Sequence, residues 1–266
     1  MRFPEQYINN NGLQRKNAED ISNTYIQRMV WKSNEIVLDL GCGPGDVTSD
    51  ILYPLLMNNI NQLIGVDKSI EMVKYAKKTY ERSKMSFEVL DIENTNDCSF
   101  YSHKFNKIFS FFCFHWVRNK ADSLSNMNLM LKSGGEILIN FMLTNPFAEL
   151  YTSVDPEWLK YVKDIKYKFH NLYSQDEMRE IFIKAGFRII HLESNVKKYT
   201  FSDLSSFLNT IKAADDMYTL LPQHLHDRYS LYIKEKICEI QAVEICPITG
   251  VTTLSYNPIT VHAIKD

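Results

Sequence analysis

Hydrophobic residues in the first half of the chain follow two alternating spacings, one typical of helices and one typical of strands. Apolar side chains recur at helical spacing from Asn17 to Met29, whereas Glu35 to Leu40 is a short apolar run that ends at glycines. A helical stretch follows from Asp46 to Met57, and Gln62 to Val66 is a second apolar run. The pattern therefore predicts helix, strand, helix and strand in this order.

The alternation continues toward the middle of the chain. Ser69 is placed to cap a helix from Ile70 to Tyr80, and Ser86 to Leu90 alternates as a strand does. Lys107 to Phe114 is hydrophobic and rich in aromatic residues, as expected of a central strand buried on both faces. The next predicted elements are a helix from Asp122 to Leu131, a turn from Lys132 to Gly135 and a strand from Glu136 to Leu143.

The second half is less regular. Residues 145 to 173 are rich in Tyr, Phe, Trp and Lys, and Ser174 then caps a helix that ends at Gly186. Arg188 to Leu192 resembles a strand, two helices are expected between Phe201 and Cys246, and Val251 to Ile264 is rich in strand-forming residues.

Repeated strand and helix units predict an α/β fold with a mostly parallel sheet that binds its ligand at the carboxyl ends of the strands. A chain of 266 residues is within the range of one large α/β domain, so a single domain is expected over 1–266. Residues 1–34 are expected to form an N-terminal cap over substrate and cofactor. Helical segments at about 145–185 and 201–246 are expected to cover the substrate.

Charge and composition narrow the function. The net charge of -2, from 30 basic and 32 acidic residues, gives no reason to expect nucleic acid as a partner. The absence of a leading apolar run and of any long apolar stretch predicts a cytoplasmic protein without a membrane span. Five cysteines without C-x-x-C spacing predict reduced thiols and no zinc. His224 and His226 fall on different helix faces, so no metal site is expected.

Three glycines directly after the first predicted strand indicate a ligand-binding loop. Gly41, Gly43 and Gly45 let the backbone turn sharply and approach a ligand closely. A dinucleotide loop would need G-x-G-x-x-G, but Asp46 occupies the last of these positions, and a phosphate-binding P-loop would need Gly-Lys-Ser/Thr. Asp39 and Asp46 would also repel a pyrophosphate, whereas they suit the cationic sulfonium and ammonium groups of S-adenosylmethionine.

Two later acids follow strands in the same way. Asp67 can accept hydrogen bonds from both ribose hydroxyls, or alternatively cap the helix that begins at Ile70. Asp91 can accept from an adenine amino group while Ile92 packs on the ring.

The motif Asp39-Leu40-Gly41-Cys42-Gly43-Pro44-Gly45, with Gly65-Val66-Asp67 and Leu90-Asp91-Ile92, resembles the successive motifs of class I methyltransferases over about half the chain. The resemblance implies a Rossmann-like seven-stranded sheet with an antiparallel last strand, and S-adenosylmethionine as cofactor. It also implies that the glycine loop wraps the methionine part, that Asp67 holds ribose and that Asp91 holds adenine. The expected cofactor-binding residues are Asp39, Gly41, Cys42, Gly43, Asp67, Lys68, Asp91, Ile92 and Phe111.

A narrower resemblance lies in Tyr7 to Ala18 and in Phe111 to Val117. These segments are similar to the insect juvenile hormone acid O-methyltransferases, which esterify sesquiterpenoid acids. The resemblance implies farnesoic acid or juvenile hormone acid as substrate. Aromatic and aliphatic side chains of the second half are candidates to line a slot for such a chain: Phe147, Tyr151, Trp158, Tyr161, Phe207, Leu208, Ile211 and Met217.

The expected catalytic residues are Gln14, Trp116 and His115. Gln14 and Trp116 offer neutral donors that would hold a carboxylate without reducing its nucleophilicity. A carboxylate is already ionised, so methyl transfer to it needs alignment and no general base. His115 is the candidate base if the acceptor is instead a small amine or phenol, and packing at a strand end is another interpretation of His115 and Trp116. A non-catalytic cofactor-binding scaffold is a third hypothesis, and a monomer or homodimer is expected.

Overall fold

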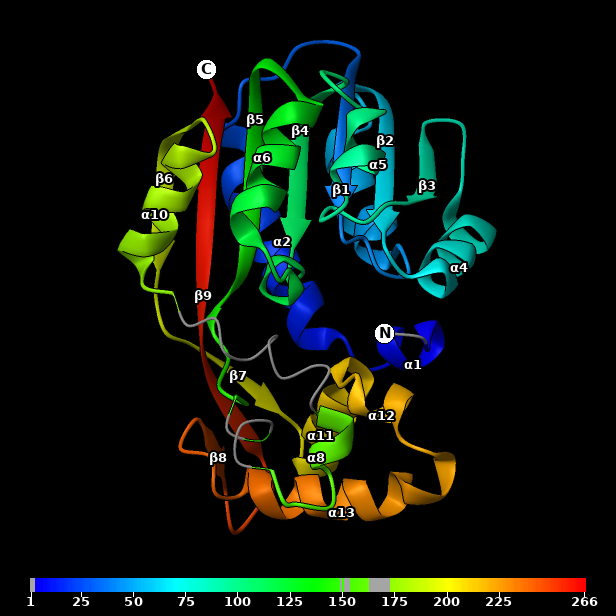
Figure 1. The fold of residues 1–266 in the computed structure, drawn as a ribbon, viewed down its shortest axis with the longest axis vertical. Coiled ribbons are helices and arrows are strands. Elements are labelled where there is room, and N and C mark those ends of the chain that lie inside the picture. Colours follow the sequence, from blue (N-terminus) through cyan, green and yellow to red (C-terminus); the bar gives the residue numbers. More distant parts are fainter. Residues whose placement is uncertain (1–2, 149, 151–153, 163–172) are drawn as a thin grey trace.

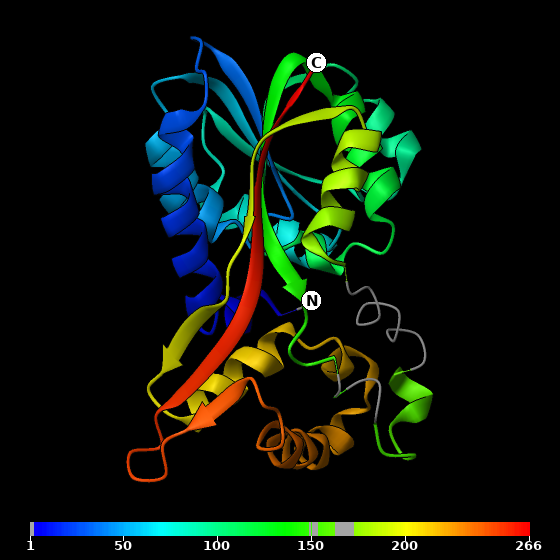
Figure 2. The ribbon, with the colours of Figure 1, turned by 90° about the vertical axis from the view of Figure 1, so that its left-hand side faces the viewer.

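A computed structural model describes residues 3–148, 150, 154–162 and 173–266. A twisted sheet forms the upper body in Figure 1, and a smaller group of helices lies beyond the carboxyl ends of its parallel strands. Figure 2 shows the sheet edge-on between two layers of helices. This arrangement confirms the predicted α/β fold.

The sheet contains the order β3-β2-β1-β4-β5-β9-β6, in which β9 runs antiparallel to β5 and β6. The expected parallel sheet with an antiparallel last strand is therefore confirmed. Its strands are β1 (Glu35–Leu40), β2 (Ile60–Asp67), β3 (Met85–Val89), β4 (Phe105–Phe111), β5 (Leu131–Thr144), β6 (Phe187–Ser194) and β9 (Thr252–Lys265).

The strand count differs from the expected seven. Strand β9 extends beyond the main sheet, and its first residues pair with β7 (Lys197–Phe201) and β8 (Val243–Ile245). The sheet therefore has nine strands in the described part of the chain. The extension of β9 ties the small helical group to the main sheet.

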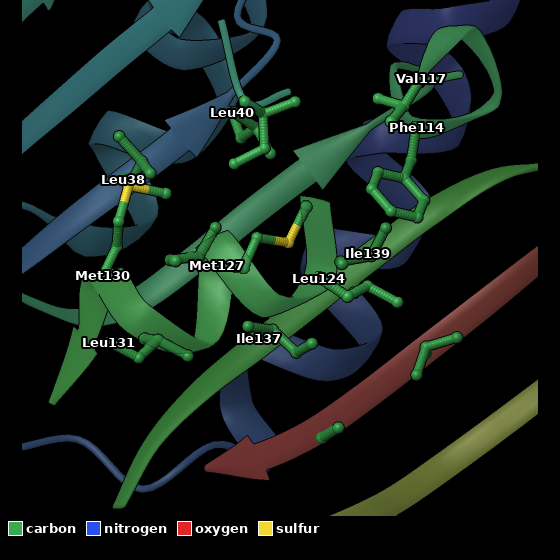
Figure 3. Close-up of a cluster of buried hydrophobic side chains, with 14 of the residues drawn as sticks. Leu38, Leu40, Phe114, Val117, Leu124, Met127, Met130, Leu131, Ile137 and Ile139 are labelled. Atoms are coloured by element: carbon green, nitrogen blue, oxygen red, sulfur yellow. The ribbon is translucent and has the colours of Figure 1, made fainter. Parts of the chain in front are cut away.

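Helices cover both faces of the sheet because each buries one apolar stripe against it. One face packs against α2 (Gly12–Tyr25), α3 (Tyr53–Leu56) and α4 (Ile70–Tyr80). The other face packs against α5 (Thr95–Ser99), α6 (Lys120–Met130) and α10 (Gln175–Lys184). Figure 3 shows Leu124, Met127 and Met130 of α6 directed at the strands. The predicted caps Ser69 and Ser174 are confirmed for α4 and α10.

The helical group beyond the strand ends has its own apolar core, centred on Trp158, Phe207 and Tyr229. Its elements are α8 (Leu159–Val162), α11 (Leu204–Ala214), α12 (Met217–Leu220), the 3-10 turn Gln223–Leu225 and α13 (His226–Ile237). Helix α10 lies within the cover expected at about 145–185, but it packs on the sheet through Met178 and Phe182. The part of the expected 145–185 cover that forms α10 therefore belongs to the helical layer on the sheet.

Three further predictions need correction. The strand expected from Lys107 to Phe114 ends at Phe111, because Phe112 has a φ of 50° and a 3-10 turn occupies Phe114–Trp116. The turn expected from Lys132 to Gly135 is a bulge inside β5, where the register with β4 shifts. The helix expected from Asp46 to Met57 contains a π-helical turn at Thr48–Leu52.

The N-terminal segment forms α1 (Pro4–Ile8), α2 and a 3-10 turn at Ile26–Arg28. In Figure 1, α1 lies between the strand ends and the small helical group. Across the described residues, no helix combines the length and apolarity needed to cross a membrane.

Candidate active site

Three adjoining hollows lie at the carboxyl ends of the parallel strands. The strand-end hollow is bordered by residues that follow β1, β2 and β3, the glycine-loop hollow by the turn after β1, and the apolar hollow by the helical group. Trp116 lines all three hollows. A ligand in the first two would therefore meet a ligand in the third at Trp116.

The glycine loop leaves β1 through a tight turn. Gly41 and Gly43 have φ angles of 75° and 55°, a region that L side chains rarely adopt. The backbone N–H groups of Gly41 and Cys42 both donate to Val66 O, at 2.7 and 2.9 Å. A Cβ at Gly41 would lie 2.1 Å from Cys113 Sγ, whereas one at Gly43 would meet nothing within 4 Å. Gly41 is therefore required by packing, and Gly43 borders open space.

Asp67, the last residue of β2, is fixed by two backbone donors. Its Oδ2 accepts from Gly43 N at 3.1 Å and its Oδ1 accepts from Ser69 N at 2.8 Å. Burial raises the pKa of this carboxyl group above its usual value, although both hydrogen bonds oppose the increase. Ser69 accepts from Met72 N and caps α4, so the alternative of Asp67 as the helix cap is wrong.

Asp39 lies at the base of the glycine-loop hollow and is only 2% exposed. Thr48 donates a hydrogen bond to its Oδ2 at 2.6 Å. The pKa of Asp39 is raised to about 7, mainly by burial and with smaller contributions from the carboxylates of Asp46 and Asp67, while the hydrogen bond from Thr48 opposes the increase. A ligand cation in this hollow would reverse that effect by stabilising the carboxylate.

The glycine-loop hollow is acidic. Asp39, Asp46 and Asp67 line it, and its described lining includes no lysine or arginine. Although Arg15 pairs with Asp46, these carboxylates disfavour a pyrophosphate and suit a ligand with a sulfonium and an ammonium group. Cys42, Gly43 and Phe111 lie at the same hollow, as expected of cofactor-binding residues.

The strand-end hollow contains the remaining expected cofactor residues, Lys68, Asp91 and Ile92. Asp91 Oδ1 accepts from Glu93 N at 3.0 Å, and Asn126 Nδ2 donates to Ile92 O at 2.7 Å. These bonds hold the loop after β3 in place. Met72, Leu90 and Val117 supply apolar surface on which a flat ring would pack.

The N-terminal helices are fixed over the glycine loop. Asp46 Oδ2 accepts from Asn11 Nδ2 at 2.9 Å and from Arg15 Nη1 at 2.6 Å. Thr210 Oγ1 of α11 donates to Asn10 O at 2.9 Å, which joins the turn between α1 and α2 to the helical group. Tyr7 and Gln14 consequently line both the glycine-loop hollow and the apolar hollow.

Most of the lining of the apolar hollow is apolar, but a few polar side chains also reach it. Gln14 Oε1 and His115 Nδ1 are buried there without a hydrogen-bond partner in the described structure. Burial, reinforced by the charge of Lys120, lowers the pKa of His115 to about 3, so the imidazole is neutral at physiological pH. Asp215 also lines the hollow, but its oxygens accept from Met217 N and Tyr229 Oη, at 2.9 and 3.0 Å.

The structure brings together the expected catalytic residues Gln14, His115 and Trp116. Phe147, Phe207 and Ile211 also line the apolar hollow as expected, whereas Trp158, Tyr161, Leu208 and Met217 pack in or against the core of the helical group. Tyr151 lies outside the described residues. Thr210 was not expected in this lining, and the Tyr7-to-Ala18 resemblance was the one signal for Tyr7. Phe112, expected beside the methionyl end of the cofactor, lines both the glycine-loop hollow and the apolar hollow.

Comparisons with known proteins agree with this site. Residues 31–186 match a family model described as a methyltransferase domain. The chain is 30% identical to juvenile hormone acid O-methyltransferase of Drosophila melanogaster over 84% of this chain and 78% of that protein. It is 29% identical to the Bombyx mori enzyme of the same name over 100% and 98% of the two chains. A malonyl-[acyl-carrier protein] O-methyltransferase of a Paenibacillus strain is 24% identical over 76% and 73%.

Solved structures share the fold. A Bacillus halodurans protein classed as a methyltransferase superimposes with a TM-score of 0.61 and 19% identity, over 92% of this chain and 98% of that chain. Phosphoethanolamine N-methyltransferase 2 of Haemonchus contortus, solved in complex with S-adenosyl-L-methionine, gives a TM-score of 0.51 and 19% identity over 92% and 52%. With its acidic glycine loop and S-adenosylmethionine as cofactor, the chain belongs to the class I methyltransferases, in the family that includes the insect juvenile hormone acid O-methyltransferases.

Proposed function

We propose that the protein methylates the carboxylate of a lipophilic acid, and that the acid is a sesquiterpenoid such as juvenile hormone acid or farnesoic acid. The observation that carries this proposal is the apolar hollow, which meets the cofactor hollows at Trp116 beside Gln14, whose side chain lines both hollows. Leu13, Phe112 and Phe207 give the hollow the apolar wall that an isoprenoid chain requires. The names of the insect relatives point to the same substrate class.

The expected cofactor residues suggest how S-adenosylmethionine would lie across the strand-end hollow and the glycine-loop hollow. Asp67 and Asp91 would accept hydrogen bonds from ribose and adenine, and Asp39 would face the methionyl ammonium group. S-adenosylmethionine, when bound, would supply a methyl carbon that the acceptor oxygen attacks, and the sulfur would leave as a neutral thioether. Gly43 leaves room for the ligand, and Lys68 lines the strand-end hollow next to Asp67 in the chain.

A carboxylate acceptor agrees with the electrostatics of His115. A general base is most effective when its pKa is near the working pH, and the pKa of His115 is lowered to about 3. An acid that is already ionised needs no proton removed. The residues then act by position: the Gln14 amide and the Trp116 indole orient the oxygen, and His115 forms part of the wall.

In this proposal the N-terminal cap and the helical cover enclose the cofactor and the acid. In the expected N-terminal cap, Asn11 and Arg15 hold α2 against Asp46 of the glycine loop. The segment 201–246 supplies Phe207, Thr210 and Ile211 to the apolar hollow. Exclusion of water by these segments strengthens every electrostatic contact inside the site.

The test is a competition assay with isotope-labelled S-adenosylmethionine and an equal mixture of farnesoic acid, juvenile hormone acid, lauric acid and a primary amine. The proposal expects labelled methyl esters, with a terpenoid ester as the main product by mass. A methylated amine would overturn it in favour of the His115-dependent alternative. Cofactor binding without any product would support the scaffold hypothesis.

Two variants connect the product to the site. Gln14→Leu should lower kcat/KM for the preferred acid by about tenfold or more, because the carboxylate loses a donor. The exposed Gln223 in the 3-10 turn Gln223–Leu225 provides the matched control, and Gln223→Leu should have no effect. Equal activity of the two variants would remove Gln14 from the proposed site.

A further inference from the structure

Lys120 is a buried lysine at the start of α6, only 4% exposed. Its Nζ donates to Val117 O at 3.0 Å. The ammonium also lies 5.9 Å from the centre of the Phe114 ring and 5.4 Å from that of Tyr173. The side chain therefore folds back against the turn that carries His115 and Trp116.

No carboxylate of the described residues lies within ion-pair distance of Lys120. Glu93 acts on it from a greater distance, and its Oε1 already accepts from Arg118 N and Asn119 N. A buried ammonium that has only a carbonyl oxygen and two aromatic rings beside it, and no anion, is unfavourable for the fold alone. This cost is explained if a ligand supplies the missing negative charge.

The field of Lys120 reaches the apolar hollow. His115 lines that hollow, and the charge of Lys120 contributes to the lowered pKa of its imidazole. Val117, whose carbonyl oxygen binds Lys120, directly follows Trp116. An acid held at Trp116 would thus experience the attraction of Lys120 from behind the turn.

We propose that Lys120 is a positioning residue for the acceptor carboxylate: it fixes the Phe114–Val117 turn by its bond to Val117 O, and its charge attracts the acid without touching it. The inference rests on the proposed carboxylate acceptor. A direct lysine contact would hold electron density on the oxygen and reduce its nucleophilicity, whereas a charge behind the turn favours binding and leaves the oxygen free to react.

This arrangement makes acid binding depend on pH. Burial lowers the pKa of Lys120 to about 8, against the opposing effect of Glu93. Two other titratable side chains lie beside Lys120. His115 stays neutral near pH 8, and Tyr173 faces the ammonium with its aromatic ring. The attraction should therefore be nearly complete below about pH 7, be half lost near pH 8 and disappear at higher pH.

The experiment measures kcat/KM for a monocarboxylic acid from pH 6.5 to 9.5 at saturating S-adenosylmethionine. The wild-type value should fall by about tenfold above pH 8. Lys120→Arg retains a charge that does not titrate, so its profile should be flat. Lys120→Met should be low at every pH, mainly through a higher KM.

Lys265 provides the matched control. Its Nζ donates to the carbonyl oxygens of Asn128 and Leu131 at the opposite end of the sheet, and burial lowers its pKa as well. Lys265→Met should leave the KM and the pH profile unchanged. A Lys120→Arg profile that falls like that of the wild type would overturn the inference. A wild-type protein that forms no ester at any pH would instead overturn the proposed function.

Discussion

Arg15 of α2 and Asp46, which follows the glycine loop, form an ion pair in which Nη1 lies 2.6 Å from Oδ2. The carboxylate is buried while the guanidinium is about one-third exposed, so the pair lies where the N-terminal helices meet the loop. Asn11 donates to the same oxygen. The position of Tyr7 and Gln14 over the site therefore depends on an acidic residue of the loop itself.

Arg15→Met should weaken S-adenosylmethionine binding and lower the stability by on the order of 1–3 kcal/mol, because Asp46 loses a charged donor. Isothermal titration and thermal unfolding measure the two effects. Lys16→Met provides the control, since Lys16 pairs with Asp20 on the exposed side of the same helix. Equal losses in both variants would show that the pair with Asp46 has no special role.

Gly41→Ala should abolish cofactor binding. The new methyl group would lie 2.1 Å from Cys113 Sγ and 2.4 Å from Cys113 Cβ, so the turn after β1 would have to move. Gly134→Ala is the control for backbone strain alone, because the φ of Gly134 is similar, at 72°, and a Cβ there meets nothing within 4 Å. Gly134→Ala should therefore cost about 1–2 kcal/mol of stability and leave cofactor affinity intact. Cofactor binding by Gly41→Ala at wild-type affinity would contradict the packing argument.

The sequence predicted the strands and helices around the glycine loop well because local rules determine them. A strand, a glycine turn and a capped helix follow one another between Glu35 and Tyr80, and each depends on neighbours in the chain. Asp39, Asp67 and Asp91 fall at strand ends, and a parallel sheet brings such ends to one edge.

The acceptor side was predicted less well because distant contacts determine it. The N–H of Phe112 still donates to Asn140 O of β5, but its positive φ turns the chain away and ends the strand that the hydrophobic run appeared to continue. Strand β7 is recognisable only through its pairing with the far end of β9. Trp158 and Met217 look like pocket residues by composition but pack inside the helical group.

Cofactor affinity should increase with pH up to about 7 and then remain constant. In the free protein the pKa of Asp39 is raised to about 7, so below that pH the carboxyl group is protonated before the cation binds. A cation binds the ionised form more tightly, and affinity should therefore fall by up to about tenfold for each pH unit below 7. Titration calorimetry between pH 5.5 and 8.5 measures the slope.

The Asp39→Asn variant should bind more weakly than the wild type at pH 8 and should lose this pH dependence. Asp20→Asn, at an exposed ion pair of α2, should retain it. A slope that persists in Asp39→Asn would assign the titration to Asp67, whose pKa is also raised by burial.

A variant of His115 distinguishes methyl transfer to a carboxylate from a reaction that needs a general base. If the acceptor is an acid, His115→Asn should lower kcat by less than about tenfold, because the imidazole only lines the pocket. The kcat of the wild type should also be constant from pH 5.5 to 7.5 at saturating substrates. A neutral imidazole whose pKa is about 3 has no proton change in that interval. A loss of about 10²- to 10⁴-fold, the range for a lost general base, would instead indicate an amine or phenol acceptor. Initial rates with farnesoic acid and with the amine, measured on both proteins, distinguish these outcomes directly.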